Sequence, residues 1–280
     1  MTRVNVATED SAQKDYLRIA TVNVNGIRAA YRKGMAEWLA QREVDILTLQ
    51  EVRAPDDVVS ELIGDGWHIL HAEAEAKGRA GVALVSRQEP VETRIGIGDP
   101  YFATTGRWVE ADFALPNDEK LTVVSAYVHS GEVDTPKQVD KYRFLDEMIT
   151  KLPAMAQESD HVVITGDLNV GHTELDIKNW RGNIKRAGFL PEERAYFDRF
   201  FGEEIGYKDV ARELAGPVEG PYTWWSQRGQ AFDNDTGWRI DYHMATPAFA
   251  ARARQAVVDR AASYDTRFSD HAPLVVDYSL

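Results

Sequence analysis

Polar side chains follow several apolar stretches of the chain, and their chemical types fit one reaction. Asn25, Glu51, Asp167 and Asn169 carry amide or carboxylate oxygens, which are the groups that hold a hard cation such as Mg2+. A divalent ion beside a phosphate supports hydrolysis, provided that a water is made nucleophilic and the phosphate charge is neutralised. These residue types therefore indicate a metal-assisted attack of water on a phosphate ester.

Other polar groups in similar positions have roles in the same reaction. Asp167 can orient and deprotonate the water, while His271 and the metal neutralise phosphate oxygens. An imidazole does this well only when its second nitrogen is fixed, and Asp241 is the candidate partner. A Ser-His-Asp triad for acyl transfer uses similar residue types, but the sequence lacks the Gly-x-Ser-x-Gly elbow that exposes the serine.

Each of these residues also has an ordinary structural interpretation. Glu51 alone fits a solvated loop acid, and Asp167 alone fits a turn former. Tyr127 lies in an apolar stretch and fits a core position, while His271 fits a capping histidine. The combination of all of them at strand ends is what favours a functional site, because buried strands hold the side chains at their ends rigidly.

At least eight strands are predicted from apolar runs and alternation. They cover residues 17–25, 44–49, 81–86, 108–113, 121–128, 161–165, 239–244 and 273–278. The turn at residues 116–120 is expected to join the fourth and fifth of these strands as a hairpin. Five strand ends then present Asn23 with Asn25, Glu51, Tyr127, Asp167 with Asn169, and Asp241, and a loop carrying Ser269, Asp270 and His271 enters the last strand.

Amphipathic helices are predicted between the strands, at residues 33–42 and 137–152 and from Pro191 onward. Strands with interspersed helices indicate the α/β class. The predicted fold is a four-layer α/β sandwich, in which two packed mixed β-sheets are flanked by helices.

Composition limits the remaining possibilities. The 280 residues show no break that argues for a second large domain, and without cysteine there can be no disulfide or thiolate metal site. The net charge of -13 counts against nucleic acid as a partner. A basic face can nevertheless coexist with an acidic back. The distribution of charge over the surface therefore matters more for DNA binding than the net charge.

The beginning of the chain differs from the rest. Residues 1–15 are polar and are expected to form a disordered tail, with a catalytic domain at residues 16–280. The tail lacks the apolar core of a signal peptide, and no run approaches the roughly 18 apolar residues of a membrane helix. We therefore expect a cytoplasmic protein that has no membrane partner.

The motifs, in order and spacing, resemble the exonuclease III and abasic (AP) endonuclease family of the endonuclease/exonuclease/phosphatase superfamily. The segments are NVNGIR (23–28), LQEV (49–52), GDLN (166–169), GWRID (237–241) and SDH (269–271). The Gln-Glu, Gly-Asp-x-Asn and Ser-Asp-His motifs of the superfamily, taken alone, are equally compatible with inositol-phosphate phosphatases and sphingomyelinases. Residues 176–183 and 187–194 resemble the DNA-repair branch and favour it.

This resemblance implies a monomeric hydrolase that cuts double-stranded DNA on the 5' side of abasic sites. Exonuclease action in the 3'-5' direction and cleaning of blocked 3' ends are implied as well. The implied cofactor is Mg2+, with Mn2+ as a substitute.

The resemblance also assigns roles to residues of this chain. The catalytic residues would be Asn23, Tyr127, Asp167, Asn169, Asp241 and His271. The metal ligands would come from Asn25, Glu51, Asp167, Asn169, Asp270 and His271. The substrate would contact Arg28, Ser130, Lys178, Asn183, Arg186, Trp224, Trp238 and Ile240. Two positions depart from the pattern of relatives: Asn25 stands where some carry Asp, and Ser130 where many carry Asn or Gln.

A base-less sugar turned out of the duplex needs an apolar pocket that excludes an intact nucleotide. Trp224, Trp238 and Ile240 match the pocket positions of the family, although the aromatic segment 222–226 also fits a core. DNA would be gripped by basic residues of predicted loops, namely Arg28, Lys77, Arg79, Lys178, Arg181, Lys185, Arg186 and Arg228.

Two alternatives stay open at this point. The chain could be a phosphatase that acts on a small-molecule or lipid phosphate. It could also be a non-catalytic nucleic-acid-binding relative, although such a protein has no need to retain nearly every catalytic residue type.

Overall fold

The computed structural model of the chain describes residues 14–280. The tail predicted at residues 1–15 therefore lies almost wholly outside the described residues. The first strand begins at Tyr16, where the catalytic domain was predicted to start.

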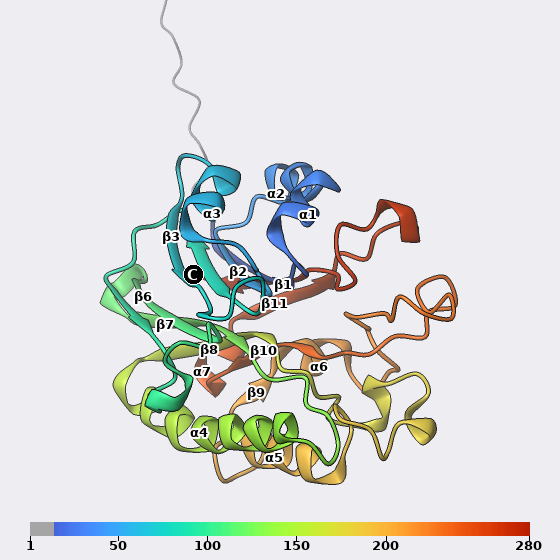
Figure 1. Cartoon of the computed structure of the whole chain (residues 1–280). Helices are drawn as coiled ribbons and strands as arrows, with labels where there is room; N and C mark the ends of the chain where they lie inside the picture. Colours follow the sequence, from blue (N-terminus) through green and yellow to red (C-terminus); the bar gives the residue numbers. More distant parts are fainter. Residues whose placement is uncertain (1–13) are drawn as a thin grey trace, which may run out of the picture.

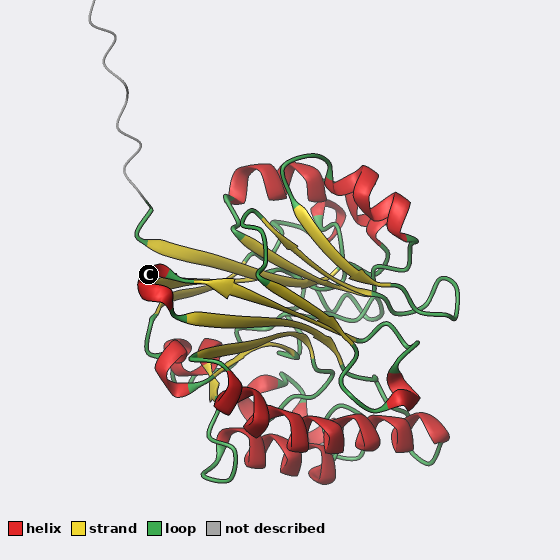
Figure 2. Cartoon of the chain, turned by 90° about the vertical axis from the view of Figure 1, so that its left-hand side faces the viewer, coloured by secondary structure: helices red, strands yellow, loops and turns green. Residues whose placement is uncertain are grey.

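Two mixed six-stranded sheets form the centre of the molecule (Figure 2). The order in the first sheet is β11-β12-β1-β2-β4-β3, and in the second β5-β6-β7-β8-β10-β9. The first sheet contains β1 (Tyr16–Asn23), β2 (Ile46–Gln50), β3 (His68–Ala72), β4 (Val82–Ser86), β11 (Ala253–Val258) and β12 (Leu274–Ser279). The second contains β5 (Glu92–Ile95), β6 (Trp108–Ala114), β7 (Lys120–Tyr127), β8 (His161–Asp167), β9 (Lys208–Asp209) and β10 (Asp241–Ala245).

Helices cover the two outer faces of this pair of sheets (Figure 1). The first sheet is covered by α1 (Ile27–Arg32), α2 (Met35–Arg42) and α3 (Asp56–Ile63), and the second by α4 (Pro136–Glu158) and α5 (Pro191–Phe201). Two short helices, α6 (Val210–Ala215) and α7 (Pro247–Ala250), lie near β9 and β10. The four-layer α/β sandwich predicted from the sequence is thus confirmed. Single 3-10 turns occupy Pro100–Phe102, Pro116–Asp118, Glu174–Asp176, Trp180–Gly182 and Tyr264–Thr266.

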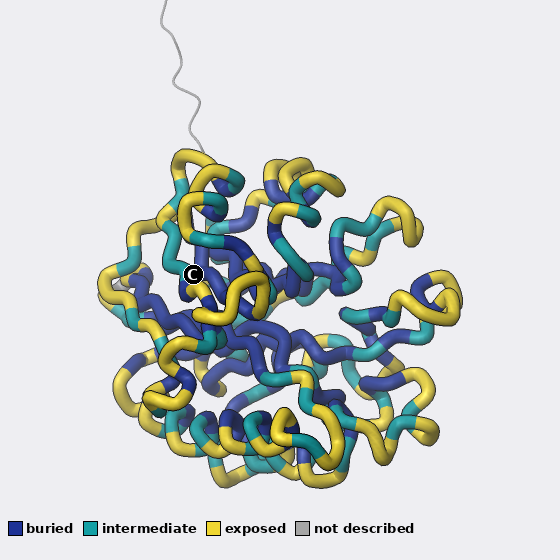
Figure 3. The backbone as a smooth tube through the Cα atoms, viewed as in Figure 1, coloured by how far each residue is buried: buried dark blue, intermediate teal, exposed yellow. Residues whose placement is uncertain are grey.

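Three apolar clusters correspond to the three interfaces between the layers. Because successive side chains of a strand point to opposite faces, Ile19 of β1 packs between the sheets, while Ala20 and Val22 pack under helices α1 to α3. In the second sheet, Val123 of β7 faces the other sheet, and Val124 faces α4 and α5. The central strands are therefore buried on both faces, as the dark blue centre of Figure 3 shows.

All eight predicted strands are present, and the turn at residues 116–120 joins β6 and β7 as predicted. The strands that the sequence did not reveal are β3, β5, β9 and β11. They lie at or near the sheet edges, where exposure removes the apolar pattern: β5 reads ETRI and is largely exposed.

Helix boundaries also differ from the prediction. The helix predicted at 33–42 begins at Met35, because Gly34 adopts a left-handed conformation with φ of 103°. The helix predicted at 137–152 continues through Pro153 to Glu158, and Met155 beyond the proline is buried. None of the helices within residues 14–280 is long and apolar enough to cross a membrane.

Candidate active site

The topology brings the predicted strand ends to one place. In the parallel pairs β1–β2 and β7–β8, Asn23 lies opposite Gln50 and Tyr127 lies opposite Asp167. Strand β10 runs antiparallel to β8 and begins at Asp241, which is also opposite Asp167. The loops that follow β8 and precede β10 and β12 (yellow, orange and red) lie on one side of the molecule in Figure 1.

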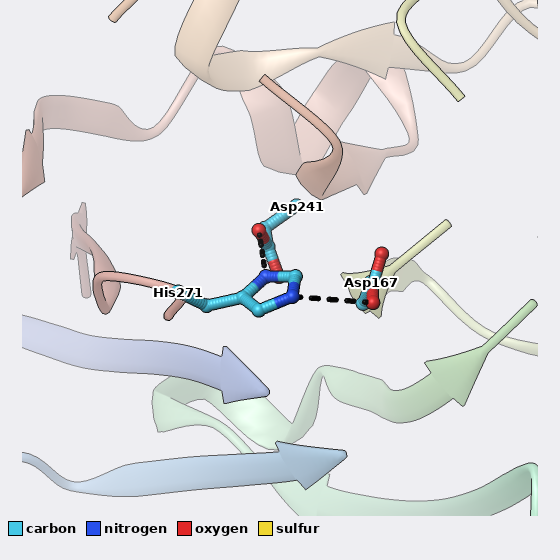
Figure 4. Close-up of side chains that lie close together, drawn as sticks. All are labelled: Asp167, Asp241 and His271. Carbon is cyan, nitrogen blue, oxygen red and sulfur yellow. Dashed lines mark hydrogen bonds and ion pairs between the residues drawn. The ribbon is translucent and has the colours of Figure 1, made fainter. Parts of the chain in front are cut away.

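His271 lies between two buried carboxylates that come from neighbouring strands (Figure 4). Its Nδ1 is 2.8 Å from Oδ2 of Asp241, and its Nε2 is 3.7 Å from Oδ2 of Asp167. The predicted pairing of His271 with Asp241 is therefore present in the structure. The other oxygen of Asp241, Oδ1, is buried and has no hydrogen-bond partner among the described residues.

These neighbours shift the proton affinities of the site. Burial disfavours the imidazolium, but the charges of Asp241 and Asp167 outweigh that penalty and raise the pKa of His271. Burial also raises the pKa of Asp167, against the opposing effect of His271. A cationic imidazole thus faces a carboxyl group whose proton affinity is increased toward that of a general base.

Asn23 links Asp167 to Glu51. Its Nδ2 donates to Oδ2 of Asp167 at 2.9 Å and to Oε1 of Glu51 at 3.0 Å. The hydroxyl of Tyr127 donates to the same Glu51 oxygen at 2.7 Å, and Arg53 pairs with the other oxygen. Burial, followed by the charge of Glu51, holds the pKa of Tyr127 well above its usual range, so the phenol remains a donor.

Asn169 and Asn25 are each held by a carboxylate. The main-chain N of Asn169 donates to Oδ1 of Asp167 at 2.9 Å, and its Nδ2 to Oδ2 at 3.2 Å. Nδ2 of Asn25 donates to Oδ1 of Asp270 at 2.9 Å. Asn25, Glu51 and Asn169 all have positive φ, between 47° and 52°. Such conformations are uncommon outside glycine and cluster at functional sites.

A cavity of about 540 Å³ opens above these groups. Its lining includes most of the site residues that were predicted from the sequence: Asn25, Glu51, Tyr127, Ser130, Asp167, Asn169, Asn183, Arg186, Trp224, Trp238, Ile240, Asp270 and His271. Asn23 and Asp241 are buried and contact the lining residues without lining the cavity themselves.

Two predicted substrate residues lie away from this cavity. Arg28 lines a neighbouring cavity of about 280 Å³, together with Lys77 and Arg79. Lys178 is exposed and forms an ion pair with Glu219.

Sequence reasoning missed Arg53, which lines both cavities and pairs with Glu51. Its position two residues after Glu51 is the signal that was available.

The donor set fits a hard divalent cation. Glu51, Asp270 and Asn25 offer carboxylate and amide oxygens in the lining of the cavity, and oxygen is the ligand atom that such ions prefer. Asp167, Asp241 and His271 also offer ligand atoms within 4.8 Å of one another. Both ring nitrogens of His271 already face carboxylates, however, so the imidazole is poorly placed to act as a ligand.

Four of the eight basic residues that the sequence suggested for DNA binding line the two cavities: Arg186 lines the larger one, and Arg28, Lys77 and Arg79 line its neighbour. In the part of the chain that the structure describes, none of these four residues forms an ion pair, and neither do Arg181, Lys185 and Arg228. Positive charge that is left without acidic partners near a site is available to bind phosphates.

Comparison with known proteins agrees with this geometry. The model of the endonuclease/exonuclease/phosphatase family matches residues 20–271. An exodeoxyribonuclease of Bacillus subtilis is 32% identical over 259 residues, which cover 92% of this chain and 98% of that protein. Two solved structures each have a TM-score of 0.81 and cover 94% of this chain and 100% of their own. One is an AP endonuclease from Archaeoglobus fulgidus (27% identity), and the other is a 3' phosphatase from Neisseria bound to a product DNA hairpin (25% identity). The chain therefore belongs to the endonuclease/exonuclease/phosphatase family.

Proposed function

We propose that this chain is a divalent-metal-dependent DNA repair nuclease. It hydrolyses the phosphodiester on the 5' side of an abasic site, and at the same site it removes nucleotides and blocking groups from 3' ends. The observation that carries this proposal is the convergence of Asp167, His271 and Glu51 in one cavity that is also bordered by two indole rings. The exodeoxyribonuclease and AP endonuclease names of the relatives support it.

The proposed reaction forms a bond between a water oxygen and phosphorus and breaks the bond from phosphorus to the 3' oxygen. Asp167 takes the proton of the attacking water, because its raised pKa suits a base near neutral pH. Asn23 and Asn169 each donate to Asp167 and fix its orientation. The 3' oxygen leaves with the electron pair of the broken bond and takes a proton from solvent. The products are a 3' hydroxyl on the preceding nucleotide and a 5' phosphate on the base-less sugar.

His271 supplies positive charge to the phosphate. Asp241 holds its Nδ1 and favours the protonated ring, so Nε2 can donate to a phosphate oxygen. We propose this role in place of the metal ligation expected from the sequence, because a protonated imidazole cannot bind a cation. The hydroxyl of Tyr127 holds Glu51 in position.

We propose Mg2+ as the physiological ion, with Mn2+ as a substitute, held mainly by Glu51, Asn25 and Asp270. A divalent ion there would polarise the phosphate and lower the charge that the attacking water meets. Asn25 in place of a third carboxylate leaves this ligand set less negative than three acids would be.

Trp224, Trp238 and Ile240 are proposed to enclose the base-less sugar. The two indoles meet edge to face, with ring centroids 5.9 Å apart, and Nε1 of Trp224 donates to Asp270 at 3.2 Å. An apolar wall that is tied to a proposed metal ligand would place the sugar beside the phosphate that reacts. The unpaired basic residues around the cavities are proposed to bind the duplex on either side.

Residues 16–280 are proposed to form a single catalytic domain that acts as a monomer. The elements of this range share the three apolar clusters, which supports one folding unit.

One set of assays tests the proposal. The wild-type chain is incubated with an abasic duplex, a recessed 3' end, a 3'-phosphate end and inositol phosphates, each with Mg2+, Mn2+ or chelator. We expect cleavage of the DNA substrates only, and only with a metal. Hydrolysis of the inositol phosphates alone would establish the phosphatase alternative, and DNA binding without any hydrolysis would establish the binding-protein alternative.

A variant tests the role of Asp167. Asp167→Asn should lower abasic-site cleavage about a thousandfold or more, because the base is lost, while duplex binding in chelator persists. Asp198→Asn is the matched control, since Asp198 is exposed and pairs with His172. Full cleavage by Asp167→Asn contradicts the assigned role.

A further inference from the structure

A buried arginine separates the two apolar residues that form one wall of the cavity. Side chains alternate along an extended segment, so Trp238 and Ile240 point into the cavity and Arg239 points the opposite way. Trp238 and Ile240 line the cavity, and Arg239 is only 1% exposed. Its guanidinium therefore lies directly behind the proposed sugar pocket.

The guanidinium of Arg239 is clamped by two carboxylates. Nη1 and Nη2 lie 3.0 and 2.6 Å from the two oxygens of Asp209, and Nε lies 2.7 Å from Oδ1 of Asp176. Arg212 completes the cluster through its Nη2, 2.6 Å from the same Asp176 oxygen. The two guanidinium groups thus face two carboxylates, so the charge of the buried Arg239 is balanced. Burying such a charge without partners would be costly.

This cluster fastens the segments that carry the pocket wall. The main-chain N of Arg239 donates to Asp176 O at 2.8 Å, and Trp238 and Trp224 exchange two main-chain hydrogen bonds of 2.9 Å. Arg212 also donates to the carbonyls of Gly216, Val218 and Gly220, in the loop that leads to Trp224. Movement of Arg239 would consequently shift both indoles.

The indole of Trp238 has little free space on its other side. A Cβ atom at Gly188 would lie 2.8 Å from Cζ3 of Trp238, so the ring packs directly on the Gly188 backbone. The Gly188 backbone and the Arg239 cluster thus act together to hold the Trp238 ring in position.

We propose that Arg239 is a positioning residue that sets the selectivity of the pocket for a base-less sugar over an intact nucleotide. This inference rests on the proposed function. A pocket rejects a larger group only while its walls are held to a fraction of an ångström. Lysine cannot replace the arginine, because a single ammonium cannot match both oxygens of Asp209 and reach Asp176 as well.

The test compares Arg239→Lys with Arg18→Lys. Arg18 is a matched control, because its Nε and Nη2 bind both oxygens of Asp277 at 2.7 and 2.9 Å, between β1 and β12 and outside the cavity. For each folded variant, kcat/KM is measured on an abasic duplex and on a recessed 3' nucleotide. Dissociation constants are measured in chelator for a duplex with a tetrahydrofuran abasic analogue and for the undamaged duplex.

In Arg239→Lys, the preference for the abasic substrate should fall about tenfold or more, as expected when a pocket no longer excludes a larger group. The binding preference for the tetrahydrofuran duplex over the undamaged duplex should fall as well. In Arg18→Lys, the ratio of the two kcat/KM values and the ratio of the two dissociation constants should both stay within about twofold of wild type. A folded Arg239→Lys with unchanged ratios overturns the proposal. Equal losses in both variants overturn it too, because they would reflect stability alone.

Asp209→Asn provides a second variant if Arg239→Lys does not fold. It keeps an amide oxygen for the clamp but removes its charge, and Asp277→Asn is its control. The same two ratios decide the outcome, with an unchanged preference again overturning the proposal. Failure of the proposed function is distinguishable, because the wild-type chain would then show no cleavage of the abasic duplex.

Discussion

A buried ion pair beneath the active site leads to a quantitative prediction about stability. Lys141 of α4 and Glu193 of α5 are both fully buried, with Nζ and Oε1 2.7 Å apart. The ammonium also donates to the carbonyls of Asn169 at 2.9 Å and Ser130 at 3.2 Å. Burial lowers the pKa of Lys141, against the opposing charge of Glu193. The pair thus ties both helices to the two loops that follow β7 and β8.

The magnitude follows from what each substitution leaves behind. Lys141→Met leaves the carboxylate of Glu193 buried without its cationic partner, and removing one partner of a buried pair costs about 3–5 kcal/mol. Two carbonyls lose a donor as well, at roughly 1 kcal/mol each. Glu193 keeps three other donors, namely Gln138 Nε2 and the main-chain N of Gly188 and Leu190. These donors partly stabilise the carboxylate that has lost its partner. We therefore expect the free energy of unfolding to fall by about 4 kcal/mol.

Urea unfolding of four proteins measures this effect. The set is the wild-type chain, Lys141→Met, Glu193→Gln and the double variant, all at neutral pH. Each single variant leaves one buried charge, whereas the double variant leaves none. The double variant should therefore be destabilised by at least about 2 kcal/mol less than the sum of the single variants. Additive losses, or a loss under about 1 kcal/mol in Lys141→Met, would refute the reasoning.

Three further predictions concern the catalytic histidine, a buried core histidine and DNA contact at Arg186. Asp241→Asn should lower the pKa of His271, because a carboxylate that raises this pKa is lost. The alkaline limb of the pH profile of kcat/KM should then move to lower pH. An unmoved limb would contradict the proposed role of the His271–Asp241 pair. Burial lowers the pKa of His243 to about 3. The unfolded chain, with a histidine pKa of about 6.5, therefore binds one more proton as the pH falls below that value. Wild type should lose about 2 kcal/mol more stability between pH 7 and pH 5 than His243→Gln, as urea unfolding at the two pH values would show; equal losses count against it. Arg186→Ala should reduce the slope of log Kd against log salt for duplex binding by about one. Lys137→Ala is the control and should leave the slope as in wild type, because the Lys137 ammonium is paired with Glu132. Equal slopes in all three proteins would count against DNA contact at Arg186.

Much of the fold could be predicted from local pattern. Central strands such as β8 are continuous apolar runs because both of their faces are buried, and this signal needs no knowledge of partners. Edge strands such as β5 carry no such signal, since their side chains are exposed. The order and spacing of short motifs identified the family, because they name the residue types that the chemistry requires.

The sequence by itself therefore determined the layers, the family and most of the residues around the cavity. Only the tertiary structure decided the contacts between them. Register places Asp241 opposite Asp167, and folding leaves Lys178 outside the cavity. The clamp on Arg239 joins residues that are 30 and 63 positions apart. Periodicity reports whether a side chain is buried but carries no information about which distant group it meets, so such pairs become visible only once the chain has folded.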